Sequence, residues 1–101
     1  LAILLSRSRR VGVDIEYRSD RIRRIASRFL RPDESAGSTD DLLTCWCVKE
    51  AVYKLRSASH LAYDQMRVHL DTATADDLLA ADSLSFGREI TADYVLVWTS
   101  E

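Results

Sequence analysis

Two carboxylates, Asp14 and Glu16, lie two positions apart in the segment Val11–Tyr17, where apolar and polar residues alternate. Alternation with a period of two predicts a strand, so both carboxylates project from the same face, about 6 to 7 Å apart along it. A divalent cation could bind between them, because Mg²⁺ prefers hard oxygen ligands of this kind. Gly12 on the same face would leave room for a ligand. The alternative is a strand whose polar side simply faces water.

Lys49, Glu50 and Lys54 form a second group of charged residues, inside a helix predicted over residues 40–56. Apolar and aromatic side chains occur all round this helix, which is the pattern of a helix mostly buried in protein. A charge buried there without a partner costs on the order of several kcal/mol. Glu50 and Lys54 stand four residues apart and could pair with each other, as an exposed ion pair worth about 0.3 to 0.5 kcal/mol. The other interpretation is that these charges serve a ligand.

The use of lysine in this helix favours a ligand that carries phosphate. The sequence has twelve Arg and only two Lys, and both lysines, Lys49 and Lys54, lie here. A flexible ammonium suits a phosphate as a point charge in a tight site where a guanidinium would be too large. Phosphate binding by both lysines is therefore an alternative to the ion pair.

A basic stripe is predicted on the preceding helix, which begins after a potential N-cap, Asp20, and stops before Pro32. Its members recur at helical spacing and are Arg21, Arg24, Arg28 and Arg31. The simpler interpretation is a solvated helix face, although exposed helices usually mix both signs of charge to limit repulsion. The functional interpretation is an electropositive surface that docks an acidic protein.

Short strands and loops are predicted around the two helices that carry these charged residues. Residues 1–5 and Val11–Tyr17 are predicted to form a β-hairpin joined by a polar turn at residues 7–10. Residues 33–39 are predicted as a loop, residues 65–70, 83–86 and 94–99 as strands, and residues 74–80 as a short segment of helical composition.

Composition limits the class of protein. With 101 residues, 47% of them hydrophobic and 30% charged, the chain has the size and composition of one globular domain. No apolar run approaches the roughly 20 residues that span a bilayer, and residues 1–5 are too short for a signal peptide, so we expect a cytoplasmic protein without a membrane partner.

The two cysteines and two histidines lack the spacing of a disulfide framework, a zinc site or a nucleophilic site; they are Cys45, Cys47, His60 and His69.

Charge is distributed unevenly along the chain. Residues 1–31 carry nine Arg and three acidic residues, a local charge of +6, whereas residues 32–101 carry five basic and thirteen acidic residues, a local charge of −8. A basic segment on an acidic chain favours a localised anionic partner and excludes bulk nucleic-acid binding, which requires a basic domain. The chain begins inside an apolar run without a methionine, so we expect the natural polypeptide to extend upstream.

Two segments together resemble the signature motifs of the 4′-phosphopantetheinyl transferase superfamily. They are residues 11–16, VGVDIE, and residues 46–54, WCVKEAVYK. The first resembles V/I-G-V/I-D-I/V-E and the second W-x-x-K-E-A-x-x-K. Between them, residues 28–34 resemble the R-F-x-x-x-E motif with altered spacing. The order and separation of the motifs also fit, and a weaker similarity covers most of the remaining chain.

The resemblance implies an α+β fold in which an antiparallel sheet packs against a long central helix. It also implies an enzyme that moves the phosphopantetheine arm of coenzyme A onto a serine of an acyl or peptidyl carrier protein, releasing 3′,5′-adenosine bisphosphate. Such enzymes serve fatty-acid, polyketide or nonribosomal peptide synthesis.

Roles for individual residues follow from the matching positions. The resemblance implies that Asp14, Glu16 and Glu50 hold Mg²⁺, and that Lys49 and Lys54 contact the phosphates of coenzyme A. Glu50 would also be the base for the attacking serine, directly or through a metal-bound water, and Lys54 a second catalytic residue. The arginine stripe, Arg21 to Arg31, would dock the acidic carrier protein.

Residues 1–6, Glu16 and Trp46 resemble the longer, surfactin-synthetase-activator type of the superfamily, a pseudodimer of two similar halves. Residues 1–101 would then be a single domain, the C-terminal half, and its site would need the N-terminal half or an oligomer for completion. The Gly-rich turn that usually follows the second lysine is replaced by residues 56–59, RSAS. Two alternatives stay open: a non-catalytic binding module with the same fold, and a small homotrimeric holo-acyl-carrier-protein synthase.

Overall fold

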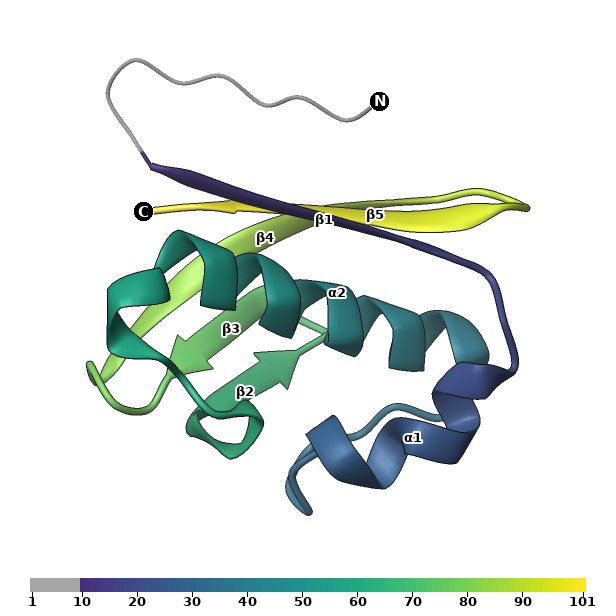
Figure 1. Cartoon of the computed structure of the whole chain (residues 1–101), viewed down its shortest axis with the longest axis horizontal. Helices are drawn as coiled ribbons and strands as arrows, with labels where there is room; N and C mark the ends of the chain where they lie inside the picture. Colours follow the sequence, from purple (N-terminus) through teal and green to yellow (C-terminus); the bar gives the residue numbers. More distant parts are fainter. Residues whose placement is uncertain (1–9) are drawn as a thin grey trace.

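The computed structural model of the chain describes residues 10–101, and in them the fold is of the α+β class (Figure 1). Within these residues, two α-helices and two short 3₁₀ helices accompany five strands. In chain order the elements are β1 (Val11–Tyr17), α1 (Arg21–Phe29), α2 (Thr39–Leu55), η1 (Ser57–Ser59), η2 (Tyr63–Gln65), β2 (Met66–His69), β3 (Thr74–Asp77), β4 (Asp82–Ile90) and β5 (Tyr94–Ser100). The sequence-predicted α+β class and antiparallel sheet are confirmed.

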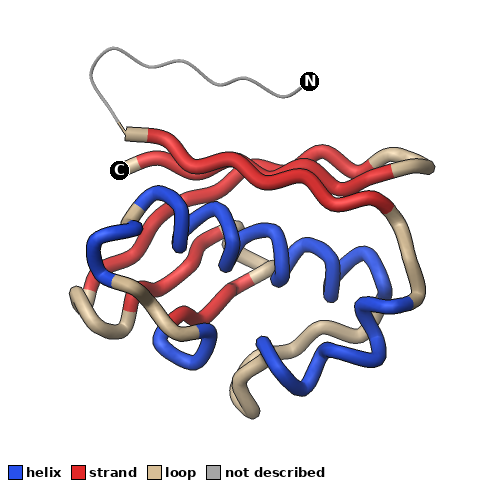
Figure 2. Tube along the Cα trace, viewed as in Figure 1, coloured by secondary structure: helices blue, strands red, loops and turns tan. Residues whose placement is uncertain are grey.

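The sheet is antiparallel throughout and has the strand order β1-β5-β4-β3-β2, so the first strand pairs with the last (Figure 2). β1 pairs with β5 in a register that places Asp14 opposite Val97 and Glu16 opposite Val95. Helix α2 packs on one face of this sheet, chiefly against β1 and β5, and α1 packs on α2. The core lies between them, with Val48, Val95 and Val97 fully buried.

The polar face of β1 points into the protein rather than to water. Gly12 and Asp14 are buried, whereas Ile15 and Tyr17 on the other face are 37% and 70% exposed. The strand approaches α2 so closely that a Cβ on Gly12 would overlap the carbonyl oxygen of Ala51 and lie 3.1 Å from Cβ of Leu55. The prediction that Gly12 makes room for a ligand is therefore wrong: the space is filled by α2.

The outer face of the sheet is apolar where β1 and β5 meet. Ile15, Tyr17 and Trp98 are among the most exposed large apolar side chains of the described residues, and the Trp98 ring covers Gly87 of β4. Figure 1 shows both α-helices on the opposite side of these strands. In residues 10–101 this face therefore lacks a covering helix.

Several element predictions are confirmed and others are corrected. Helix α1 ends at Phe29, before Pro32 as predicted, but Asp20 makes no side-chain cap, since its backbone is already in the helical region. In α2, which begins at Thr39 rather than at residue 40, the Ser38 hydroxyl is the N-cap and accepts from the Asp41 amide at 3.0 Å. Residues 74–77 form a strand, because pairing with β2 and β4 overrides their helical composition. The predicted strand at residues 1–5 lies outside the described residues.

None of the helices in the described part of the chain has the length and apolar character needed to cross a membrane.

Replacing Gly12 tests the close approach of β1 and α2. We expect Gly12→Ala to lower the free energy of unfolding by about 1 to 3 kcal/mol, because the added methyl group meets helix backbone that cannot move aside independently. Gly37→Ala is the matched control: nothing lies within 4 Å of its added Cβ, so stability should stay equal or rise by less than about 1 kcal/mol. Urea denaturation of both variants measures the difference, and equal stabilities would contradict the packing described.

Candidate functional site

The candidate site lies where the polar face of β1 meets α2. Trp46, Glu50 and Lys54 follow one another at four-residue intervals, so they share one side of the helix. Asp14 and Glu16 share the inward face of β1, the strand that α2 packs against. The strand and the helix thus bring together residues that are 30 to 40 positions apart in sequence.

Asp14 is 7% exposed and binds Lys54, whose Nζ lies 2.7 Å from Oδ1. The same ammonium donates to the carbonyl of Val13 at 3.3 Å. The second carboxylate oxygen, Oδ2, is buried and has no hydrogen-bond partner in residues 10–101. A buried charged oxygen without a donor is costly, and native proteins rarely keep one without a ligand, water or ion to satisfy it.

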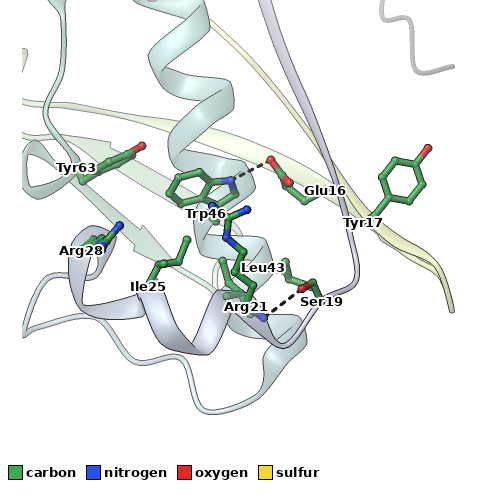
Figure 3. A pocket seen from close by; sticks show the side chains of 10 residues that line it. Glu16, Tyr17, Ser19, Arg21, Ile25, Arg28, Leu43, Trp46 and Tyr63 are labelled. Carbon is green, nitrogen blue, oxygen red and sulfur yellow. Dashed lines mark hydrogen bonds between the residues drawn. The ribbon is translucent and has the colours of Figure 1, made fainter.

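Glu16 is oriented by an aromatic donor. The indole Nε1 of Trp46 donates to Oε1 of Glu16 at 3.0 Å (Figure 3). The indole is a neutral group that can only donate, so it fixes the carboxylate without neutralising its charge.

Glu50 has a similar neutral partner. The hydroxyl of Tyr63 donates to Oε1 of Glu50 at 2.9 Å, and Glu50 makes no ion pair with Lys54 among the described salt bridges. The interpretation of Glu50 and Lys54 as a simple i, i+4 pair is thus wrong. Because Trp46 and Lys54, one turn before and after, bind β1, Glu50 lies on the side of α2 that faces this strand.

The three carboxylates share one pattern. In each, one oxygen accepts from a protein donor, and the other has no donor within residues 10–101. No group of three or more His, Cys, Asp or Glu side chains in those residues is arranged as a metal site. The donor chemistry nevertheless fits Mg²⁺, since all three are hard oxygen ligands and one of their oxygens is buried and unsatisfied.

Lys49 has a different place from the one the motif implies. Its side chain is fully buried, and its ammonium donates to Glu34 Oε1 at 2.6 Å, to the Phe29 carbonyl at 2.6 Å and to the Tyr63 carbonyl at 3.0 Å. These three acceptors use all the donors that an ammonium has. Lys49 therefore has no donor left for a phosphate in this structure, which contradicts its predicted contact with coenzyme A.

Glu34 completes this buried pair. Its Oε1 also accepts from the Arg31 amide at 2.7 Å, and its Oε2 accepts from the Val68 amide at 2.7 Å. A compact pocket of oxygens explains why lysine rather than arginine stands at position 49, because a guanidinium fork would not fit three convergent acceptors. Lysine at position 49 therefore serves protein acceptors rather than the phosphate that the sequence predicts.

Lys54 keeps the freedom that Lys49 lacks. Its side chain is 53% exposed although it binds Asp14, so the ammonium can reach a ligand from the surface.

A cavity of about 560 Å³ opens beside Glu16, between β1, α1 and α2 (Figure 3). Its apolar walls come from Ile22, Ile25, Leu43 and the rings of Trp46 and Tyr63. Its polar lining comes from Glu16, Ser19, Arg21 and Arg28. The cavity can therefore take a ligand with an apolar stem and an anionic end.

The arginine stripe is shorter than predicted. Arg21, Arg24 and Arg28 are exposed on α1. Arg31 lies beyond the end of α1, and its guanidinium binds Asp33 at 2.9 Å and the carbonyl of Asp64. These bonds hold Arg31 to its own loop and raise the pKa of its guanidinium, chiefly through Asp33, so it does not belong to the exposed stripe.

The thiols take no part in the site. Cys45 and Cys47 are buried and unpaired with each other. Burial raises the pKa of Cys45 to about 12 and that of Cys47 as well, so neither is a thiolate at neutral pH.

Two residues of this region have structural roles that the sequence did not assign: Tyr63, which no motif includes, and Glu34, which only the R-F-x-x-x-E resemblance includes. Tyr63 lies nine positions beyond the second motif in a 3₁₀ turn, and Glu34 lies in a loop, so neither has a periodic signal. The one available signal for Glu34 was the R-F-x-x-x-E motif, whose spacing is one residue longer here.

A family model described as the 4′-phosphopantetheinyl transferase superfamily matches residues 10–98 of the chain. No curated protein and no solved structure matches it.

The buried lysine gives a test that separates its two assigned roles. We expect Lys49→Met to lower the free energy of unfolding by about 3 to 5 kcal/mol, because it leaves Glu34 charged and buried without its partner. Lys54→Met should cost less, about 1 to 3 kcal/mol, because its partner Asp14 is buried but the ammonium itself lies at a half-exposed position that water can fill. Chemical denaturation measures both. If Lys49→Met kept full stability and lost coenzyme A affinity instead, the phosphate role would be right and the structural role wrong.

Proposed function

The chain belongs to the 4′-phosphopantetheinyl transferase superfamily, and from this premise we propose that it transfers the phosphopantetheine arm of coenzyme A to a serine of an acyl or peptidyl carrier protein with the help of Mg²⁺. The observation that carries the proposal is the buried Oδ2 of Asp14, which has no hydrogen-bond partner within residues 10–101. It lies beside a half-exposed lysine, and Glu16 and Glu50 are held on the same strand–helix pair.

The proposed reaction is a phosphoryl transfer. The serine hydroxyl attacks the phosphorus next to the pantetheine arm, the bond to the bridging pyrophosphate oxygen breaks, and 3′,5′-adenosine bisphosphate leaves. Asp14, Glu16 and Glu50 would hold Mg²⁺, which supplies charge neutralisation of the pyrophosphate when bound.

The residues of this chain have separate tasks in that reaction. Lys54 brings a positive charge to the phosphates, since its ammonium is accessible while bound to Asp14. Glu50 accepts the serine proton, since one of its oxygens has no donor within residues 10–101. Lys49 supports the site structurally, through its buried ion pair with Glu34 and its hydrogen bonds to the Phe29 and Tyr63 carbonyls.

The cavity beside Glu16 is the proposed place for the pantetheine arm. That arm is an apolar chain with amide groups, which suits walls made of Ile25, Leu43, Trp46 and Tyr63. Its phosphate end would then lie near Glu16 and the other carboxylates.

Arg21, Arg24 and Arg28 are the proposed docking surface for the carrier protein. They are exposed on one side of α1, and two of them, Arg21 and Arg28, also line the cavity. An acidic carrier protein bound there would present its serine to the mouth of the cavity.

A second, similar half or an oligomeric partner is proposed to complete the molecule. The apolar face of β1 and β5, which carries Ile15, Tyr17 and Trp98 and which no helix of residues 10–101 covers, is the surface on which such a partner would be expected to pack. On this interpretation residues 1–101 form one half of a pseudodimer.

Removal of single carboxylates tests the reaction in the longest natural polypeptide that contains this chain. We expect Asp14→Asn and Glu50→Gln to lower kcat/KM for transfer by about 100-fold or more, because each removes a charge at the reacting phosphate. Mass spectrometry of the carrier protein measures the transfer, with and without Mg²⁺. Asp71→Asn, at an exposed turn, is the control. Full activity of both site variants would refute the proposal.

Charge reversal on α1 tests the docking surface. Arg24→Glu with Arg28→Glu should raise KM for the carrier protein about tenfold at low ionic strength, because complementary charge speeds association and is screened by salt. Arg23→Glu is the matched control, since Arg23 lies on another side of the same helix and donates to Thr39. A KM that is unchanged at every salt concentration would rule out docking on this stripe.

A further inference from the structure

Two aromatic residues connect the candidate carboxylates to each other. The rings of Trp46 and Tyr63 lie 5.5 Å apart with an interplanar angle of 35°. Trp46 donates to Glu16, and Tyr63 donates to Glu50. Glu16 and Glu50, which come from a strand and a helix, are thus joined through one aromatic pair, of which Figure 3 shows both rings and the bond to Glu16.

The aromatic pair is itself rigidly supported. The carbonyl of Tyr63 accepts from the fully buried ammonium of Lys49 at 3.0 Å. The indole of Trp46 also packs on Phe29, with ring centroids 5.3 Å apart and an interplanar angle of 74°. Both donors are therefore fixed by the core, whereas the side chain of Lys54, the donor to Asp14, is half exposed.

The chemistry of these donors suits carboxylates that must keep their charge. An indole N–H and a phenol O–H are neutral, so they orient a carboxylate without forming an ion pair with it. Each aromatic donor occupies Oε1 alone and leaves Oε2 of its carboxylate for another ligand.

We propose that Trp46 and Tyr63 are positioning residues that fix Glu16 and Glu50 for joint binding of one divalent cation with Asp14. The proposal rests on the proposed function, since it deepens the account of the same site. It assigns a task to Tyr63, a residue outside the sequence motifs, and it makes the aromatic pair part of the cation site rather than of the cavity wall alone.

The test uses Mn²⁺ alone as the probe, titrated calorimetrically into the longest natural polypeptide that contains this chain. Tyr63→Phe and Trp46→Phe keep an aromatic ring and remove the donor. Each should weaken Mn²⁺ binding about tenfold, which is the usual effect of losing a group that orients a metal ligand. Tyr94→Phe is the matched control, since Tyr94 lies on the outer face of the sheet with Tyr17 and should bind Mn²⁺ as the parent does.

The transfer assay adds a signature that a purely structural role would not produce. In Tyr63→Phe, the Mg²⁺ concentration for half-maximal activity should rise about tenfold, while kcat at saturating Mg²⁺ stays within about threefold of the parent. Thermal melts of the variants exclude unfolding as the cause.

The outcomes separate this inference from the proposed function. If Asp14→Asn abolished Mn²⁺ binding and transfer while both aromatic variants bound Mn²⁺ with parental affinity, the positioning role would be wrong and the proposed function would stand. A parent protein that neither bound Mn²⁺ nor transferred the arm would overturn both.

Discussion

The buried ammonium of Lys49 joins several parts of this fold at one point. It connects α2 to the last turn of α1 through Phe29, to the following loop through Glu34, and to η2 through Tyr63. Glu34 extends the connection to β2 through the amide of Val68. The Lys49 ammonium and the Glu34 carboxylate are both buried, so their attraction offsets the cost of burial only while their hydrogen bonds are all kept. The positions of α1 and Tyr63, and so of the cavity that they line, depend on these hydrogen bonds.

The close contact of β1 with α2 is the second constraint on the site. Because position 12 carries no side chain, the strand backbone can pack against the backbone of Ala51 and the side chain of Leu55. The same proximity lets Asp14 and Glu16 reach Lys54 and Trp46 across the interface. The inward carboxylates are thus a consequence of the packing, and their burial explains why each is held by a specific donor.

The site combines one charged and two neutral donors. Lys54 compensates the charge of Asp14, the most buried of the three carboxylates, while Trp46 and Tyr63 fix Glu16 and Glu50 without compensating them. Such a set remains electronegative overall and keeps oxygens free, which is what a hard cation requires. The adjoining cavity, with its apolar walls and two arginines, gives a ligand access to that region from the side of α1.

The sequence alone determined the superfamily, the α+β class, the strand that carries Asp14 and Glu16, and the helix that carries Glu50 and Lys54. These follow from local periodicity and from two contiguous motifs, which need no knowledge of distant contacts. Only the tertiary structure decided which groups the charges meet. Lys49 and Lys54 look alike in the sequence, yet one is buried against Glu34 and the other is half exposed beside Asp14. Tyr63 and Glu34 lie in a 3₁₀ turn and a loop, and Gly12 contacts α2 through close packing. These contacts depend on how distant segments of the chain pack, so no periodic pattern in the sequence indicates them.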